Sequence, residues 1–283
     1  MTDILFSSDG ESNSRHGAAK KIVAVFRAER FSPNSVDRDR AIMQSVAKAV
    51  GCCSFIKEEK LPLHSALLND VDIILSMARG NDALQILTDA ESHALVVNSA
   101  AAIAVSTRSR IDSLMRNNNI PAAPLQSSNG WWIKRGDQAA QEKSDVRFAA
   151  DNNEKLRIIE EFQARGINNL VVTAHVEGDL VKFYGVAGTG FFHTCYPTDG
   201  NFSKFGDEHL NGKALHTAFN LNCLHHDASK LAGLTGIMVY GGDCIVRPDG
   251  SYAIIDFNDW PSFSCCRDEA TLAIAQLIEK MTK

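Results

Sequence analysis

Segment 240–263, YGGDCIVRPDGSYAIIDFNDWPSF, places three oxygen-bearing side chains where they could share a metal ion. The turn signal PDG at 248–250 predicts two antiparallel strands, one on each side of it. Asp256 and Asn258 are two residues apart and so lie on one face of the second strand, and Asp243 can lie opposite them on the first. Such oxygen ligands suit Mg²⁺, which usually keeps several waters and also takes phosphate oxygens.

Apolar neighbours argue against the simpler alternative, three solvated polar residues near a sheet edge. The second strand is apolar, as a central strand would be, at Ala253, Ile254, Ile255 and Phe257. A carboxylate left unpaired there would be costly, and a bound cation would remove that cost. If Asp256 is an unpaired metal ligand, Asp256→Asn should slow turnover at least tenfold, about 1.4 kcal/mol of barrier, without lowering the stability of the free protein.

Two common phosphate-binding motifs can be assessed directly. The sequence has no GxxxxGK[ST] pattern, which excludes a P-loop nucleotide-binding protein. The glycine-rich stretch 185–190, GVAGTG, has the wrong spacing for GxGxxG and leads into Phe191 and Phe192 rather than into a helix. We interpret it as a hairpin turn.

Length and composition bound the class of protein. The chain has 283 residues, enough for roughly two domains at about 150 residues each. Its 45% hydrophobic and 22% charged residues exclude a largely disordered chain. A net charge of −5 gives no general attraction to nucleic acid or to an anionic membrane, so neither is expected as a partner.

The chain shows no targeting signal and no zinc-type spacing. No apolar run approaches the roughly 20 residues that span a bilayer, and the N-terminus lacks a basic region followed by an apolar core. We therefore expect a cytoplasmic protein with a flexible tail over 1–19. The seven cysteines include no CxxC and no paired Cys/His spacing, which predicts thiols in a reducing cytosol rather than a structural zinc site. The adjacent pairs Cys52-Cys53 and Cys265-Cys266 have no assigned role.

The elements that must position these residues change in character along the chain. Strands and helices alternate at first, which predicts parallel βαβ units, with strands over 21–27, 52–56, 71–77 and 93–98 and helices over 35–51 and 81–91. The later order predicts α+β structure, with helices over 106–118, 153–166, 221–231 and 268–281 and strands over 131–134, 146–149, 170–175, 180–188, 238–246 and 252–258. The strands 170–175 and 180–188 are expected to pair around Glu177 and Gly178.

The pattern D…DG…IDxNxxPxF, from Asp243 to residue 263, resembles the metal-binding C-terminal strands of the ATP-grasp superfamily. The upstream signals follow in that superfamily's order. Residues 97–99, Arg108 and the IPxxP segment at 120–124 resemble the passage from a pre-ATP-grasp domain into the ATP-grasp domain. Residues 132–134 (WIK) resemble the strand whose lysine reaches the nucleotide phosphates, and 171–178 (VVTAHVEG) the hinge that contacts adenine.

The resemblance runs from about residue 21 to the end and implies a fold of mixed α/β and α+β class. The chain resembles in particular the ATP-binding domain of glutathione synthetase. A pre-ATP-grasp α/β domain over 20–105 would be followed by a two-lobed ATP-grasp fold. Its central lobe would span 106–178, and its C-terminal lobe, with the metal site, would span 179–283.

The resemblance also implies the ligands of ATP and Mg²⁺. Lys134 and Arg108 would contact phosphates, and Asp243, Asp256 and Asn258 would hold Mg²⁺, expected as two ions for which Mn²⁺ can substitute. Arg108 stands where many members have lysine. The alternative for Lys134 is a solvent-facing lysine at a strand end, but its position after two tryptophans favours a cleft.

The hinge implies the contacts of the nucleoside. Backbone groups of Ala174, His175 and Val176 would meet adenine, and Asp179 or Glu177 the ribose. Positions 173 and 175 carry Thr and His where Gln or Glu and Phe are common in the family.

Basic residues could line a pocket for an anionic small-molecule acceptor, although a solvated face is an equal alternative. Lys182 and Arg267 are the candidate catalytic residues, and the other basic residues are Arg135, His193, Lys204, His209 and Lys213. The preferred reaction is ligation of a carboxylate to an amine or thiol through an acylphosphate. Residues 180–188 and the IDFN tetrapeptide are also similar to inositol polyphosphate kinases, so phosphorylation of a hydroxyl is the alternative. A non-catalytic nucleotide-binding protein is a third hypothesis, and a homodimer is compatible with all three.

These expectations predict ATP binding that depends on magnesium. Calorimetric titration with ATP should give saturable binding with Mg²⁺ and weaker binding without it, because the metal offsets the repulsion between the acidic ligands and the phosphates. Absence of binding in both conditions would contradict the prediction.

Overall fold

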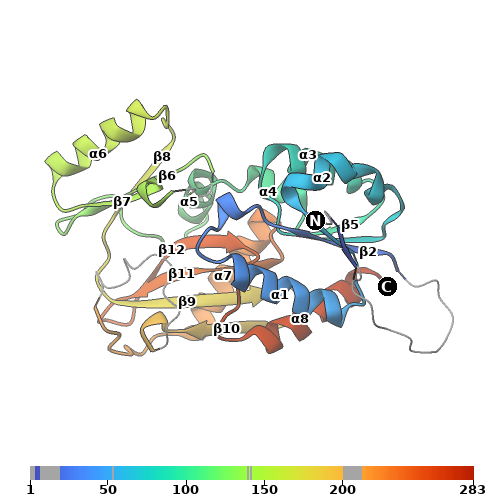
Figure 1. The fold of residues 1–283 in the computed structure, drawn as a ribbon. Coiled ribbons are helices and arrows are strands. Elements are labelled where there is room, and N and C mark those ends of the chain that lie inside the picture. Colours follow the sequence, from blue (N-terminus) through green and yellow to red (C-terminus); the bar gives the residue numbers. More distant parts are fainter. Residues whose placement is uncertain (1–3, 7–19, 53, 139, 141, 200–211) are drawn as a thin grey trace.

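The computed structural model describes residues 4–6, 20–52, 54–138, 140, 142–199 and 212–283. These residues form three β-sheets that follow one another along the chain, each covered by helices (Figure 1). Short 3₁₀ helices lie at Glu29–Phe31, Glu58–Lys60, Ser65–Asp70, Lys143–Asp145 and Pro197–Asp199. Among the described residues, no helix is both long and apolar enough to cross a membrane.

The first sheet has the predicted parallel strands. Its order is β1-β3-β2-β4-β5, with bounds β1 Ile4–Phe6, β2 Ile22–Phe26, β3 Ser54–Lys57, β4 Ile73–Ser76 and β5 Leu95–Val97. Strands β2 to β5 pair in parallel, which confirms the βαβ prediction. The connecting helices are α1 Val36–Ala49, α2 Leu61–His64, α3 Asn81–Ala90 and α4 Ala100–Val105. Helix α1 buries Ile42, Met43 and Val46 against one face of this sheet.

The prediction of a flexible tail over 1–19 is wrong for Ile4–Phe6. These residues pair antiparallel with β3 and form the edge strand β1, because the sequence ILF is apolar and strand-compatible although its flanks are polar. The rest of the predicted tail lies outside the described residues.

The second sheet has the order β7-β6-β8 and is antiparallel. Its strands are β6 Trp131–Arg135, β7 Val146–Ala149 and β8 Leu170–Ala174. Helix α6, Asn152–Ala164, covers one face by packing Ile158 and Phe162 against Ile133. Since side chains alternate along a strand, Trp132 and Lys134 of β6 face the opposite way, toward the rest of the molecule.

The third sheet has the order β10-β9-β11-β12 and is also antiparallel. Its strands are β9 Asp179–Val186, β10 Phe191–Cys195, β11 Val239–Val246 and β12 Tyr252–Asp259. Helices α5 Arg108–Asn117 and α7 Leu221–Thr235 pack on one face around Phe183 and Tyr240. Helix α8 Arg267–Met281 packs on the other face and beside α1 of the first sheet, so α1 and α8 share one core (Figure 1).

Two turn predictions have opposite outcomes. The turn at 187–190 joins β9 and β10 as a hairpin, as predicted. The expected pairing of 170–175 with 180–188 is wrong, because β8 belongs to the second sheet and β9 to the third. The chain crosses between the sheets at Gly178, whose φ is 145° and where an added Cβ would lie 2.1 Å from the Val246 carbonyl oxygen. Only glycine fits both that φ and that contact.

A buried ionic network joins the first sheet to the third. Arg27, at the end of β2, donates hydrogen bonds to Asp39 of α1 (2.8 Å) and to Asp259 at the end of β12 (3.2 Å). Arg79, which follows β4, donates to the other oxygen of Asp259. Burial alone would raise the pKa of Asp259, but Arg79 and Arg27 hold it below its usual value.

A neutral contact reinforces this junction. The side chain of Asn98 donates to the Val239 carbonyl (2.8 Å) and accepts from the backbone N–H groups of Met238 (2.9 Å) and Val239 (2.8 Å). The indole of Trp260, which is completely buried, donates to the Val97 carbonyl at 3.1 Å. The end of β5 is thereby fixed against β11 and β12, the strands that carry Asp243 and Asp256.

We predict that Asp259→Asn lowers the free energy of unfolding by about 3–5 kcal/mol, because it leaves buried arginines without their shared carboxylate. Denaturant unfolding at neutral pH measures the loss, and Asp70→Asn is a matched control because Asp70 pairs with Lys21 on an exposed surface. Equal midpoints for the two variants would contradict the role assigned to the network.

Candidate functional site

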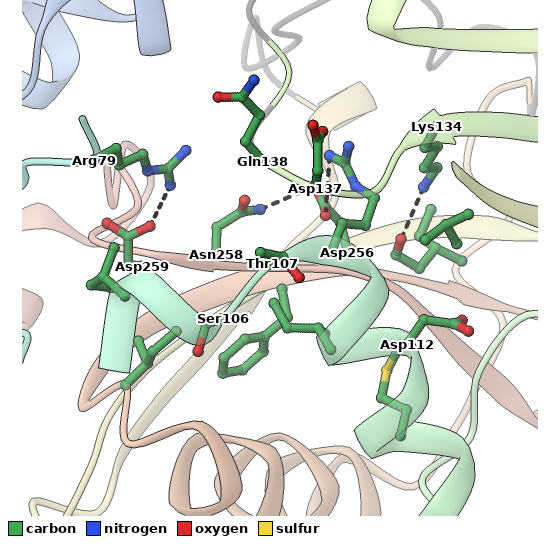
Figure 2. A pocket seen from close by; sticks show the side chains of 18 of the residues that line it. Arg79, Ser106, Thr107, Asp112, Lys134, Asp137, Gln138, Asp256, Asn258 and Asp259 are labelled. Carbon is green, nitrogen blue, oxygen red and sulfur yellow. Dashed lines mark hydrogen bonds and ion pairs between the residues drawn. The ribbon is translucent and has the colours of Figure 1, made fainter. Parts of the chain in front are cut away.

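The three predicted metal ligands converge on one face of the third sheet. Asp243 of β11 lies opposite Asp256 of β12, and Gly241 lies opposite Asn258, so the two strands bring all three side chains together. The amide of Asn258 donates to Asp256 Oδ2 at 3.0 Å. Figure 2 shows Asn258 pointing toward Asp256, whereas Asp259 turns the other way toward Arg79. The structure therefore confirms the juxtaposition that the alternation of the strand predicts.

Three cations surround these acids. Lys182 of β9 donates to Asp243 Oδ1 at 3.0 Å. Arg108, the first residue of α5, lies 3.8 Å from Asp256 Oδ1 and donates to the Arg135 carbonyl at 2.9 Å. Lys134 of β6 donates to the Ile255 carbonyl at 2.9 Å, next to Asp256 (Figure 2). In the free protein the acids are thus balanced by side chains from three different elements.

The expectation that Asp256 is unpaired is therefore wrong. Burial acts to raise the pKa of Asp256, but Arg108, Lys134 and the amide of Asn258 lower it to about 2. Burial lowers the pKa of Lys134, and the charge of Asp256 opposes that shift. Since the carboxylate is stabilised by its neighbours, its removal should cost stability rather than leave it unchanged.

A first cavity, here called the intersheet cavity, lies between the second and third sheets. The second sheet contributes Trp132, Lys134, Thr173 and Ala174, and the crossing segment, residues 175–178, contributes His175 and Val176. The third sheet contributes Leu180, Asp243, Ile245, Ile255 and Asp256. Arg108, Glu142 and Lys143 add further charged side chains, so the lining combines apolar residues with charges of both signs.

A second cavity, here called the interdomain cavity, lies between the first and third sheets. Its lining includes five cations and four carboxylates, together with the polar side chains of Asn258, Tyr184, Ser262 and Ser264. The cations are Arg27, Arg38, Arg79, Arg108 and Lys182, and the carboxylates are Asp39, Asp243, Asp256 and Asp259. A third cavity reaches Asp256 and Asn258 from the side of α5 and the loop after β6, and Figure 2 shows 18 of the residues that line it. Arg108 and Asp256 border all three cavities, so these cavities meet at the ionic cluster.

The crossing segment that was predicted to meet adenine lies at the intersheet cavity. The backbone N–H of Ala174 donates to Pro124 (2.7 Å) and that of His175 to Gly130 (2.9 Å), so these two donors are already used within the protein. The Trp132 indole donates to His175 Nδ1 at 3.2 Å. Burial lowers the pKa of His175, which favours the neutral ring that can accept this hydrogen bond.

Three predicted site residues do not line these cavities. Asp179 is buried, and its carboxylate accepts the backbone N–H groups of Leu215 and Thr217, each at 2.7 Å. These hydrogen bonds lower its pKa although burial acts to raise it. Glu177 is exposed and accepts from Asn129 at 3.0 Å. Arg267 begins α8, outside the lining of all three cavities.

Of the basic residues that were predicted to line a pocket for an anionic acceptor, some line a cavity and others do not. Lys182 borders the interdomain cavity, whereas Arg135 lies outside it and pairs with Asp137 at 2.7 Å. Lys204 and His209 lie outside the described residues. Among the described residues, His193, Lys213 and Arg267 are also absent from the lining of this cavity. Its other cations are Arg108 of α5, Arg38 of α1, and Arg27 and Arg79, which follow β2 and β4.

Arg27 and Arg79 are the site residues that the sequence analysis missed. Arg27 directly follows β2 and Arg79 is the third residue after β4, so both lie at the carboxyl ends of parallel strands, where α/β folds usually bind ligands. That rule, applied to the predicted strands, would have found them. Asp259 was missed because Asp256 and Asn258 define the opposite face of the same strand.

Comparison with protein-family models finds no match, and no curated protein matches the chain. Solved structures do match. D-alanyl-alanine synthetase A from Vibrio cholerae superposes with a TM-score of 0.62 at 10% identity, over 93% of this chain and 98% of that one. A RimK domain protein ATP-grasp from Sphaerobacter thermophilus gives 0.60 at 16% identity, over 90% and 98%. The ATP-grasp ligase PsnB, complexed with minimal precursor, gives 0.57 at 14% identity, over 91% and 99%.

We predict that Asp256→Asn lowers the free energy of unfolding by about 2 kcal/mol at neutral pH, the equivalent of a carboxyl pKa held at about 2 rather than 3.8. Because the folded-state pKa is depressed, this contribution is present above pH 4 and disappears as the pH falls through 2. Urea unfolding between pH 2 and 7 should show the two proteins converging in acid. A constant difference across that range, or none at neutral pH, would contradict the charge arrangement.

Proposed function

We propose, from the ATP-grasp fold that this chain shares with those solved structures, that it is an ATP- and Mg²⁺-dependent enzyme that ligates a carboxylate to an amine or thiol. The proposal rests chiefly on the position of Asp256. Its carboxylate borders both the intersheet cavity, which suits a nucleotide, and the interdomain cavity, which suits an acceptor. One acidic residue thus lies where a phosphate donor and its acceptor would meet.

The intersheet cavity is suited to a nucleoside triphosphate at both ends. Leu180, Ile245 and Val176 supply apolar walls for a base near the crossing segment. Lys134 and Arg108 supply positive charge at the other end. In the free protein the Lys134 ammonium donates a hydrogen bond to the Ile255 carbonyl. A phosphate could replace that carbonyl without breaking a short ion pair.

Asp243, Asp256 and Asn258 supply the hard oxygen ligands that Mg²⁺ prefers. When bound there, the metal would neutralise charge on the terminal phosphates, and two ions are the expected number. Arg108 and Lys182 hold the acids in place beforehand, at 3.8 Å from Asp256 and 3.0 Å from Asp243. Phosphoryl transfer depends mainly on such positioning and needs no covalent nucleophile from the protein.

The interdomain cavity favours an anionic acceptor. Arg27 and Arg79 are neutralised by the acids of the ionic network, so they shape the wall. Arg38 is half-buried and lines the same cavity, and no carboxylate of the described residues lies within ion-pair distance of it. A guanidinium in this position can bind a carboxylate through two parallel hydrogen bonds.

A carboxylate acceptor gives the proposed reaction its two steps. An acceptor oxygen attacks the γ-phosphorus and ADP leaves, which produces an acylphosphate. An amine or thiol then attacks the acyl carbon, and inorganic phosphate leaves with the bonding electron pair. Lys182, at the edge of the interdomain cavity, is proposed to offset charge on the transferred phosphate.

Product analysis separates this proposal from its alternatives. The full chain is incubated with Mg²⁺-ATP and sets of amino acids, other carboxylic acids and polyols, and ADP, inorganic phosphate and masses are followed. A ligase releases ADP and phosphate in equal amounts when acid and amine are both present. ADP with a phosphorylated polyol would indicate a kinase instead, and nucleotide binding without turnover across all sets would overturn the proposal of an enzyme.

We predict that Lys134→Met weakens ATP binding by about 1.5–3 kcal/mol, roughly 10- to 150-fold, because a charged hydrogen-bond donor to phosphate is lost. Calorimetry measures the change. Lys155→Met is the matched control, since Lys155 of α6 lies 4.3 Å over the Trp131 ring on the opposite face of the same sheet. Unchanged affinity in Lys134→Met, or an equal loss in both variants, would remove Lys134 from the nucleotide site.

A further inference from the structure

Three metal-binding side chains, those of His193, Cys265 and Cys266, meet between β10 and the start of α8, and the thiol of Cys195 contacts one of them. His193 and Cys195 belong to β10, and Cys265 and Cys266 immediately precede α8. The ligand atoms of His193, Cys265 and Cys266 all lie within 4.8 Å of one another. The sulfur of Cys195 lies 2.7 Å from that of Cys265, although the two residues are 70 positions apart in the chain.

The fold explains why distant residues converge here. His193 and Cys195 are two apart on β10, so they share a face, and in the ladder they lie opposite Tyr184 and Lys182 of β9. Helix α8 packs over this face of the strand at the sheet edge (Figure 1). The chain turns into the helix at Cys266, whose backbone N–H donates to the Phe263 carbonyl at 3.0 Å. The adjacent cysteines therefore arrive directly above β10.

The surroundings shield the cluster from water. The rings of Tyr184, Phe191 and Phe263 pack together beside it, and Cys266 is only 2% exposed. Thiols and an imidazole gathered in such apolar surroundings are the kind of side chains that bind zinc in proteins.

We propose that His193, Cys265 and Cys266, with Cys195 as the fourth ligand, form a Zn²⁺ site that is separate from the magnesium site. Thiolate and imidazole ligands select zinc over magnesium, whereas the oxygen ligands at Asp243, Asp256 and Asn258 have the opposite preference. Four protein ligands and no substrate position are typical of structural zinc. Tetrahedral bonds of about 2.3 Å place sulfurs about 3.7 Å apart, so Cys195 and Cys265 would separate by about 1 Å when the ion enters.

Spacing alone does not reveal this site, because neither HxC on β10 nor CC before α8 has a familiar zinc pattern. Its position suggests what the ion would do. Ser262 and Ser264, just before the two cysteines, line the interdomain cavity, and so does Tyr184 beside His193. A metal that joins β10 to the start of α8 would therefore fix one wall of that cavity.

The test measures zinc on the full chain, without any assay of turnover. The protein is purified with a reductant, treated with a chelator, reloaded with Zn²⁺ and dialysed, and the bound metal is measured by mass spectrometry. We expect about one zinc per chain for the wild type. Cys265→Ser and Cys266→Ser should lose at least tenfold in zinc affinity. Cys223→Ser, an exposed cysteine on α7, is the matched control and should keep the metal.

A second measurement avoids dependence on the folding of variants. Wild-type protein loaded with Co²⁺ should show the near-ultraviolet thiolate-to-cobalt charge-transfer absorption, and Asp256→Asn should show it equally, which separates this site from the magnesium site. Zinc content no higher in the wild type than in Cys265→Ser, or Co²⁺ bound without that absorption, would overturn the proposal. The proposal would also be overturned if the purified protein contains a Cys195–Cys265 disulfide and still takes up no zinc after that disulfide is reduced.

Discussion

The carboxylate of Asp259 is the point on which the arrangement of the molecule depends. It binds Arg27 and Arg79, which stand at the carboxyl ends of two strands of the first sheet, and it ends the strand that carries Asp256 and Asn258. Buried charges of this kind must be matched, so the first sheet can dock on the third in few ways. The interdomain cavity exists because this docking leaves the faces of Asp243 and Asp256 open toward the arginines.

A second ionic arrangement organises the proposed site. Asp256 interacts with Arg108 and Lys134, whereas Asp243 forms an ion pair with Lys182. Each acid therefore already has a cation as its partner, and each cation an anion. A triphosphate with its metal could enter by exchanging these partners, with little net change in buried charge. The low pKa of Asp256 keeps it ionised at every physiological pH, as its proposed role as a metal ligand requires. Under the proposed function, stability and activity would therefore depend on the same residues.

The sequence was sufficient for the parallel strands, for the PDG hairpin and for the shared face of Asp243, Asp256 and Asn258, because period-2 alternation and turn chemistry are local properties. It failed where long-range packing decides. The strands flanking Gly178 look like a hairpin in sequence, yet the glycine carries the chain from one sheet to another. Asp179 looks like a polar residue beside the hinge, but it binds two backbone N–H groups of a distant loop. The pairing of Asp256 with its cations likewise requires three elements that no local pattern connects.

A crystal structure with a non-hydrolysable ATP analogue and Mg²⁺ tests the central claim most directly. The account predicts the base against residues 174–176, the phosphates on Lys134 and Arg108, and metal density on Asp243, Asp256 and Asn258. The Lys134 ammonium should then have left the Ile255 carbonyl for a phosphate oxygen. A nucleotide bound elsewhere, or an intersheet cavity that stays empty at saturating analogue with Lys134 still on that carbonyl, would contradict it.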